Sequence, residues 1–237
     1  MTKVRLDHLL VKQKLVPTRS QAESYIRLNQ VKVDGRVVSK PGYFVSQEAN
    51  IEFGVKTQYV SRAALKLSSV SSLLKLDFTD KIVLDVGSST GGFTDYALQH
   101  GANKVIAVDV GTDQLHPKLR EDKRVEVHEK TDIRKFDTDD RVDIAVIDVS
   151  FISMTKVLPS VKKLIKNGGQ IIAMLKPQFE AGKDQLNKGV VKNSAQRRDI
   201  LQVFERWLRD NNFVIEMKSD SAVAGEKGNV ERFYLLK

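Results

Sequence analysis

The sequence predicts an α/β protein in which a mostly parallel sheet follows a small α+β unit. Beyond residue 80, apolar runs of strand length alternate with helix-forming segments, which is the pattern of successive βαβ units. Before residue 55, two helical patterns precede several short strand patterns bounded by turn residues. The chain of 237 residues is long enough for one large domain and one small one.

The first unit, residues 1–54, is expected to hold two helices and a few short strands. A leucine pattern over residues 6–15 predicts a helix that Pro17 breaks. Thr18 or Ser20 can cap a second helix that runs to about residue 28. An Asp-Gly pair at 34–35 favours a hairpin turn, and further short strands are expected near residues 45 and 51–53.

A polar connector at residues 55–60 separates this unit from the second domain, residues 61–237. Ser61 is a candidate N-cap for a helix to about residue 76, on which Arg62 and Lys66 share a face. A Gly-Gly pair at 168–169 is expected to end the helix before the fifth strand, and the long polar segment 178–193 is a candidate active-site lid. The predicted strands lie at 82–84, 105–108, 125–127, 144–147, 171–175, 213–217 and 232–236.

The composition excludes several classes of protein. The chain has no cysteine, which rules out disulfides and thiolate metal sites, and its four histidines lack metal-ligand spacing, so we expect no metal. No apolar run approaches the length of a membrane span, and the N-terminus lacks the apolar core of a signal peptide. We therefore expect a cytoplasmic protein with no membrane partner; no oligomeric state is predicted.

The positive charge is concentrated in the first third of the chain. The net charge is +9, and residues 1–80 hold 13 Lys and Arg against 7 Asp and Glu. Such an excess favours a polyanionic partner, because neutralised phosphates release counterions; the alternative is that the charge serves solubility alone. The candidate nucleic-acid-binding residues are Arg5, Arg19, Arg27, Lys32 and Arg62.

A glycine-rich turn directly follows the first predicted strand of the large domain. It reads Asp85-Val-Gly-Ser-Ser-Thr-Gly-Gly-Phe93, and a helix is expected to start near Thr90. Glycines allow a ligand to approach the backbone, and the first N–H groups of a helix point into such a turn. Asp109 lies 22 residues after Gly87, about the offset of a carboxylate that grips a ribose diol. The predicted nucleoside-cofactor residues are Asp85, Gly87, Ser89, Thr90, Gly91, Gly92, Phe93, Asp109 and Asp132.

The turn suits NAD or S-adenosylmethionine by its general layout, and the details favour the second. The spacing G-x-x-x-G-G departs from the dinucleotide fingerprint G-x-G-x-x-G, and the phosphate-binding loop G-x-x-x-x-G-K-[ST] is absent. Asp85 would repel a pyrophosphate, whereas it suits a ligand that carries an ammonium and a sulfonium. Asp132 is placed to meet an adenine amino group. The alternative is a structural turn that binds no ligand.

Two charged residues follow neighbouring strands of the predicted sheet and so belong to the same rim as the turn. Asp148 ends the fourth strand and Lys176 ends the fifth. A lysine in this position is a candidate catalytic base. Because covalent methylation of a pyrimidine ring needs a thiolate and the chain has no cysteine, the expected reaction is a direct displacement at the sulfonium methyl. The acceptor is a hydroxyl or a base nitrogen.

These motifs resemble two known families over nearly the whole chain. Residues 1–54 resemble an S4 RNA-binding domain through Leu6-Asp7, Thr18-Arg19-Ser20-Gln-Ala22 and Val31-Lys-Val-Asp-Gly35. Residues 61–237 resemble the FtsJ-like (RrmJ-like) methyltransferases, and the two together resemble the hemolysin A (TlyA) family of ribosomal RNA 2′-O-methyltransferases. The resemblance of residues 61–237 rests on five motifs, which are Ser61-Arg-Ala-Ala-Leu-Lys-Leu67, the turn at 85–93, Asp148-Val-Ser-Phe-Ile-Ser153, Leu175-Lys-Pro-Gln-Phe-Glu180 and Gly228-Asn-Val-Glu231.

The resemblance implies a Rossmann-like methyltransferase fold with a seven-stranded, mostly parallel sheet, S-adenosylmethionine as cofactor, and ribosomal RNA or ribosomal subunits as partner. It also implies a catalytic tetrad of Lys66, Asp148, Lys176 and Glu231. In this family Lys176 would activate the 2′-hydroxyl, Asp148 and Glu231 would orient it, and Lys66 would hold the nucleotide. One departure is visible: residues 61–64 read Ser-Arg-Ala-Ala where the family has Ser-Arg-Gly-Gly.

Two alternatives to an enzyme stay open at this point. The charged N-terminal unit is also compatible with a non-catalytic RNA-binding or ribosome-assembly protein, although the intact tetrad argues against it. The family name raises a membrane-lytic, hemolysin-type activity, which the lack of a long apolar segment or a basic interfacial helix disfavours.

Overall fold

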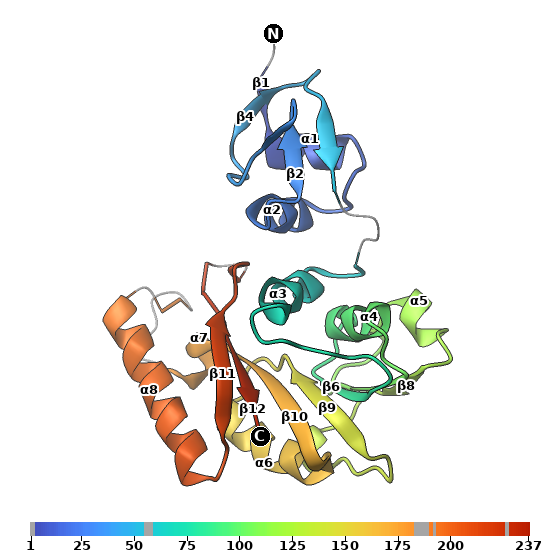
Figure 1. The fold of residues 1–237 in the computed structure, drawn as a ribbon, viewed down its shortest axis with the longest axis vertical. Coiled ribbons are helices and arrows are strands. Elements are labelled where there is room, and N and C mark those ends of the chain that lie inside the picture. Colours follow the sequence, from blue (N-terminus) through green and yellow to red (C-terminus); the bar gives the residue numbers. More distant parts are fainter. Residues whose placement is uncertain (1–2, 55–58, 183–189, 192, 226–227) are drawn as a thin grey trace.

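The structure is a computed structural model that describes residues 3–54, 59–182, 190–191, 193–225 and 228–237. The chain forms a small N-terminal domain above a larger α/β domain, and helix α3 (Arg62–Ser71) lies between them (Figure 1). Residues 55–58 of the predicted connector and residues 183–189 and 192 of the predicted lid lie outside the described residues.

The N-terminal domain consists of two short helices packed on two small antiparallel sheets, with strand pairings β1–β4 and β3–β2–β5. Thr18 caps the second helix, because its hydroxyl accepts a hydrogen bond from the Gln21 N–H at 3.2 Å. The first helix ends at Lys12, earlier than predicted, because Lys14 adopts a left-handed φ of 57°. The elements are β1 (Lys3–Arg5), α1 (Leu6–Lys12), α2 (Arg19–Arg27), β2 (Val31–Val33), β3 (Arg36–Val37), β4 (Phe44–Ser46) and β5 (Ile51–Phe53).

The large domain is built on one seven-stranded sheet in the order β11-β12-β10-β9-β6-β7-β8. The pairs β10–β9, β9–β6, β6–β7 and β7–β8 are parallel, and β12 is antiparallel to both of its neighbours. The prediction of a seven-stranded, mostly parallel sheet is confirmed. The strands are β6 (Ile82–Val86), β7 (Lys104–Val108), β8 (Val125–His128), β9 (Val142–Ile147), β10 (Ile165–Leu175), β11 (Ile215–Asp220) and β12 (Arg232–Leu236).

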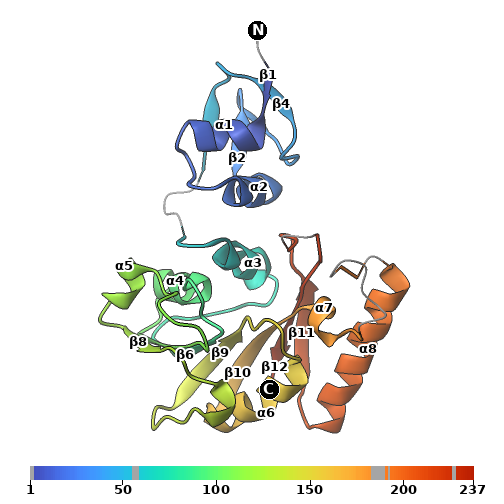
Figure 2. The same ribbon diagram turned by 180° about the vertical axis from the view of Figure 1, so that it is seen from behind.

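Helices cover both faces of this sheet, so that the domain has three layers (Figures 1 and 2). Helix α3 and helix α4 (Gly92–Gln99) bury their apolar side chains in the hydrophobic cluster on one face. Helix α6 (Met154–Leu164) and helix α8 (Ser194–Asp210) bury theirs on the other. The shorter helices are α5 (Pro117–Arg120), the 3₁₀ turn η1 (Ile133–Lys135) and α7 (Pro177–Glu180).

Three features of the sheet edges differ from the sequence predictions. Gly168 and Gly169 were expected to end a helix, but α6 ends at Leu164 and both glycines lie inside β10, whose irregular pairing with β9 begins at Ile165. Strand β11 lies two to three residues later than predicted. The first strand of the domain continues through Asp85, so that this carboxylate belongs to the end of the sheet and not to the turn that follows.

Candidate active site

The glycine-rich turn links β6 to α4 and sits at the point where the strand order reverses, which is where ligands bind in open α/β sheets. Gly87 has a φ of +80°, and a Cβ at this position would lie 2.7 Å from the Asp148 carbonyl oxygen. Only glycine therefore fits where β6 and β9 diverge. Gly91 is the N-cap of α4 with a φ of +88°, so the helix begins at Gly92, close to the predicted start.

Asp109 and Asp132 both line the larger of two cavities beside the turn. The Asp109 carboxylate accepts hydrogen bonds from the N–H groups of Ser89 (2.8 Å) and Gly111 (2.6 Å), which ties the glycine-rich turn to the end of β7. Asp132 is held by the side chain and the N–H of Arg134, and these hydrogen bonds lower the pKa of its carboxyl to about 2. Both side chains are thus fixed in place, and Asp132 is anionic.

Asp85 is fully buried and carries an unsatisfied oxygen. Its Oδ2 accepts a hydrogen bond from the Thr94 hydroxyl at 2.6 Å, while Oδ1 has no hydrogen-bond partner in the described part of the chain. Burial raises the pKa of this carboxyl to about 7, and the hydrogen bond from Thr94 opposes the rise. A buried acceptor without a partner is costly, so its position on a cavity wall indicates that a ligand supplies the donor.

Two adjoining cavities open beside these groups. The larger, of about 450 Å³, lies over the ends of β6, β7 and β9 and includes Asp109, Asp132 and the apolar side chains of Ile133 and Val149. The smaller, of about 180 Å³, is lined by Asp85, Ser88, Thr90, Phe93, Asp148 and Lys176. Gly87, Ser89, Asp148 and Ser150 line both cavities. One elongated ligand can therefore occupy an apolar-walled part and a carboxylate-lined part together.

The sheet brings three of the four predicted tetrad residues to one edge. Asp148 follows β9 and Lys176 follows β10, which are parallel neighbours, so both strand ends point to the same rim. Glu231 immediately precedes β12, in which Arg232 pairs with Leu175; Glu231 is therefore the next residue opposite Lys176. Lys66 reaches this rim from α3, which lies above it.

The four side chains form two ion pairs. Lys176 Nζ lies 2.6 Å from Asp148 Oδ1 and donates a hydrogen bond to the Ser150 hydroxyl at 2.8 Å. Lys66 Nζ donates to Glu231 Oε1 at 2.9 Å, and the Glu231 side chain is only 2% exposed. Burial raises the pKa of Asp148 above its usual value, although the positive charges of Lys176 and Lys66 oppose this. The two pairs are thus close enough to act on each other's charge.

The structure adds residues that the sequence interpretation did not single out. Phe151 is 91% exposed with a left-handed φ of 64°, and its ring centre lies 5.0 Å from that of Phe179. Glu180 accepts hydrogen bonds from Ser153 Oγ (2.6 Å) and Met154 N (2.7 Å), and so clamps the segment after β9 to α7. These residues belong to the motifs at 148–153 and 175–180, but the sequence does not show the backbone conformation of Phe151 or the contact between the two motifs.

The predicted RNA-binding residues fall into two groups. Arg5 and Arg19 converge on the buried carboxylate of Asp7, with nitrogen–oxygen distances of 2.7 and 2.9 Å. Although burial alone would raise the pKa of Asp7, the two guanidinium groups lower it to about 2. Arg27 and Lys32 are exposed elsewhere on the domain, whereas Arg62 lies between the two domains and donates to Ser20 and to the Ala224 carbonyl. The first four therefore belong to the N-terminal domain, whereas Arg62 lies on α3 at the junction of the two domains.

Comparison with known protein families agrees with this architecture. Residues 59–237 match the FtsJ-like methyltransferase family, and residues 4–51 match the S4 domain. The chain therefore belongs to the FtsJ-like methyltransferase family and carries an S4 domain at its N-terminus.

Related proteins align over nearly the full chain. It is 36% identical over 242 residues to the 16S/23S rRNA (cytidine-2′-O)-methyltransferase TlyA of Mycobacterium tuberculosis, covering 99% of this chain and 90% of that protein. It is 37% identical over 233 residues to hemolysin A of Brachyspira hyodysenteriae, covering 96% and 97%.

Solved structures confirm the fold. A Streptococcus thermophilus protein described as a hemolysin superposes with a TM-score of 0.74 at 39% identity, covering 100% of this chain and 88% of that one. A SAM-dependent methyltransferase from Aquifex aeolicus shares the fold at 19% identity, with a TM-score of 0.53 and coverage of 75% and 94%. Within the described residues, no helix has the length and apolar character needed to cross a membrane, and no group of His, Asp or Glu side chains is suited to hold a metal ion.

Proposed function

We propose that this protein transfers a methyl group from S-adenosylmethionine to a ribose 2′-hydroxyl of ribosomal RNA, with Lys176 as the base. The observation that carries the proposal is the convergence of the Lys176–Asp148 and Lys66–Glu231 pairs on the rim of the cofactor cavities. A substrate on the ribosome is supported by the activity named for the Mycobacterium tuberculosis relative, and with such a substrate we expect the protein to act in the cytoplasm.

The cavity residues fit S-adenosylmethionine. The unsatisfied Asp85 oxygen suits its ammonium group, the Asp109 carboxylate suits its ribose diol, and Asp132 with the apolar wall of the larger cavity suits its adenine. Gly87 allows the Asp148 carbonyl to lie directly against the turn, where a Cβ would come within 2.7 Å of its oxygen. When bound, S-adenosylmethionine supplies an electrophilic methyl group on a sulfonium.

The tetrad then has two tasks. The Lys176 ammonium first loses a proton to solvent, and the free amine then removes the proton of the 2′-hydroxyl as the oxygen takes the methyl. Asp148 and Ser150 hold the lysine Nζ in place, and the Asp148 carboxylate stabilises the ammonium that re-forms. Glu231 Oε2 is buried and unpaired among the described residues, so it is available to accept a hydrogen bond from the target nucleotide. Lys66 orients Glu231 by donating a hydrogen bond to its Oε1.

The surroundings suit an RNA substrate. The exposed ring of Phe151, beside the cavity and the Lys176 site, offers a surface on which an unstacked base can pack. Arg5 and Arg19, oriented by Asp7, present guanidinium groups to a phosphate backbone, together with Arg27 and Lys32. RNA binding positions the substrate, and the tetrad carries out the transfer.

The test is single-turnover methyl transfer to ribosomal subunits from cells that lack this protein. Lys176→Ala is expected to lower the rate at least about 100-fold, because a positioned base contributes roughly 10²- to 10⁴-fold. Lys176→Arg is expected to be equally inactive, since guanidinium does not lose its proton. Lys163→Ala, on the exposed side of α6, is the matched control and is expected to keep the full rate. Wild-type activity retained in Lys176→Ala would refute the assigned mechanism, and RNA binding without any methyl transfer would favour a non-catalytic RNA-binding protein.

A further inference from the structure

We propose that Arg62 is a positioning residue. It links the docking of the N-terminal domain to the position of the Lys66 and Glu231 side chains. This inference rests on the proposed function. It also gives Arg62 a different task from the RNA contact that its charge predicted.

Among the described residues, helix α3 holds the connection between β11 and β12 through Arg62, Lys66 and Ser69, whose hydroxyl accepts a hydrogen bond from the Ala222 N–H at 3.2 Å. Arg62 Nη2 donates to the Ala224 carbonyl at 2.6 Å, and Lys66 Nζ donates to Glu231 Oε1 at 2.9 Å. Arg62 and Lys66 are four residues apart, so they lie on one face of the helix, one turn from each other. The same helix face thus determines the path of the connection and the place of its catalytic carboxylate.

The contacts made by Arg62 and by Lys66 are linked by direct packing within the connection. Gly225, which follows Ala224, packs so closely on the carboxylate that a Cβ there would lie 2.6 Å from Glu231 Oε1. Its N–H also donates to the Asn229 carbonyl at 2.6 Å. A shift of Ala224 would therefore move the atoms that surround Glu231.

The second terminal nitrogen of the Arg62 guanidinium reaches the N-terminal domain. Its Nη1 donates to the Ser20 hydroxyl on α2 at 2.5 Å. On either side of this contact, Leu65 of α3 and Val223 of the connection are buried in the hydrophobic cluster of the N-terminal domain, with exposures of 2% and 1%. The small domain is thus seated on the two elements that carry Lys66 and Glu231.

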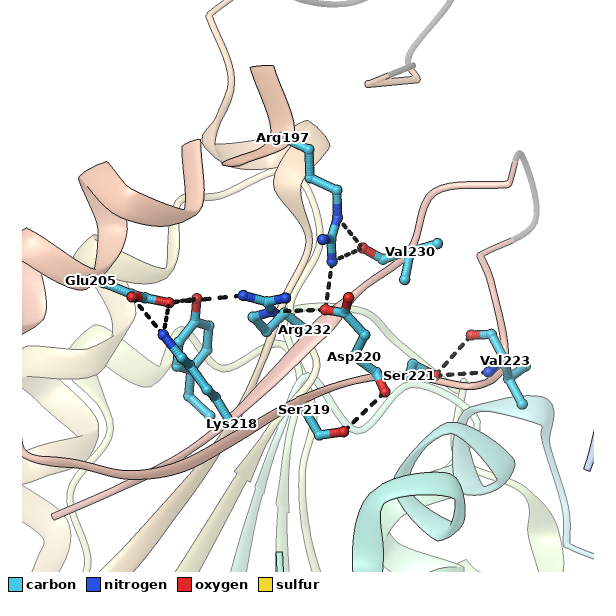
Figure 3. Close-up of polar contacts among 10 residues, drawn as sticks. Arg197, Glu205, Lys218, Ser219, Asp220, Ser221, Val223, Val230 and Arg232 are labelled. Carbon is cyan, nitrogen blue, oxygen red and sulfur yellow. Dashed lines mark hydrogen bonds and ion pairs between the residues drawn. The ribbon is translucent and has the colours of Figure 1, made fainter. Parts of the chain in front are cut away.

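The far side of the connection is held by α8 (Figure 3). Arg197 donates to the Val230 carbonyl from Nε (3.3 Å) and Nη2 (3.2 Å), and its Nη2 lies 2.6 Å from Asp220, which also binds Arg232 at 2.7 Å. The residue before Glu231 is therefore anchored independently of the N-terminal domain. Glu231 lies between this anchor and the contact made by Arg62. Loss of Arg62 frees the Ala224 carbonyl next to Glu231, while the Ser69 hydroxyl still holds Ala222.

The test compares Arg62→Ala, Arg62→Lys and Ser20→Ala with the wild type. Single-turnover methyl transfer is measured at saturating ribosomal subunits and saturating S-adenosylmethionine, and the affinity for each is measured separately. For Arg62→Ala we expect a rate loss of roughly 10- to 100-fold, the scale of a misplaced catalytic group, with both affinities within about threefold of wild type. Arg62→Lys is expected to recover only part of the rate, because one ammonium cannot span both acceptors. Arg209→Ala, an exposed arginine at the end of α8, is the control.

Ser20→Ala removes only the contact with the N-terminal domain and leaves the fold least disturbed. We expect a smaller rate loss, of about threefold to tenfold, and a double variant no slower than Arg62→Ala alone, because both substitutions break the same link. Independent rate losses that multiply would contradict the coupling. A normal saturated rate in Arg62→Ala together with weaker RNA binding would also overturn the proposal and restore the RNA-contact prediction.

Amide hydrogen exchange keeps the two proposals distinguishable, since it needs no activity. Arg62→Ala is expected to speed exchange in residues 219–225, whereas the strand residues 171–175 stay protected as in wild type. Unchanged exchange in 219–225 would overturn the role of Arg62 even if the enzyme is active. An inactive wild type with the expected exchange pattern would overturn the proposed function and leave the positioning contact standing.

Discussion

Asp85 shows how a single residue can report the nature of the ligand. It is buried at the end of β6 with one oxygen unpaired among the described residues, and burial raises the pKa of its carboxyl to about 7. The protonated form therefore dominates below that pH in the free protein. A ligand that places a cation on this oxygen favours the ionised form, so the ligand must displace a proton at low pH.

The affinity for S-adenosylmethionine is expected to rise with pH up to about 7. Between about pH 5.5 and pH 7 the dissociation constant should fall by roughly tenfold, while the ligand amino group, with a usual pKa near 7.7–8.0, stays protonated. Titration calorimetry across this range measures the effect. Asp85→Asn should bind more weakly and without this pH dependence, and a flat profile for the wild type would show that Asp85 does not face the cation.

At the scale of elements, the turn after β6 lies against the end of β9 so closely that Gly87 has no room for a side chain. Gly87 and Gly168 have the same φ of +80°, but a Cβ at Gly168 meets nothing within 4 Å whereas one at Gly87 would meet the Asp148 carbonyl. The pair therefore separates the backbone cost of a left-handed alanine from the cost of a steric clash.

Gly168→Ala is expected to lower the free energy of unfolding by about 1–2 kcal/mol, the cost of left-handed backbone for an L-residue. Gly87→Ala should lower it by about 2–4 kcal/mol, because the clash is added, and should also reduce methyl transfer by moving Asp148. Urea unfolding of both variants provides the comparison. Equal losses in the two would mean that β9 yields to the added methyl group and that the turn is less constrained than its geometry indicates.

The positions of many strands were predictable, because buried parallel strands appear in a sequence as continuous runs of apolar residues. The runs at 82–84, 105–108 and 144–147 lie within β6, β7 and β9. The start of β10 was not predictable, because residues 165–170 pair irregularly with β9 and include two glycines that are typical of a turn. The positions of Asp109 and Lys176 at strand ends followed from the same apolar pattern.

At the scale of the whole molecule, the two domains share apolar packing. Leu65 and Val223 belong by sequence to the methyltransferase domain, yet both are buried in the cluster of the N-terminal domain. Leu65 lies off the apolar stripe of α3, which Ala64, Leu67 and Val70 form on the sheet side, and nothing in the local sequence of Leu65 or Val223 shows what covers them. The meeting of Lys66 with Glu231, 165 residues later, likewise depends on tertiary packing and was expected only through the family resemblance.

Leu65→Ala is expected to lower the free energy of unfolding by about 2–5 kcal/mol, as for other large-to-small changes in a packed core. Because its side chain faces the N-terminal domain, the loss should appear as earlier unfolding of that domain in thermal scans. Leu73→Ala, just beyond α3 and 61% exposed, is the control and should change stability by no more than about 0.5 kcal/mol. An equally small effect of Leu65→Ala would show that the domains do not share this packing.

The central claim is that a methyl group is transferred to a ribose hydroxyl beside Lys176 Nζ. The most direct measurement is nucleoside analysis by mass spectrometry of ribosomal RNA methylated by the purified protein with isotopically labelled S-adenosylmethionine. We expect labelled nucleosides that carry the methyl group on the ribose with the wild-type protein and none with Lys176→Ala. Label found on a base, or label transferred equally well by Lys176→Ala, would contradict it.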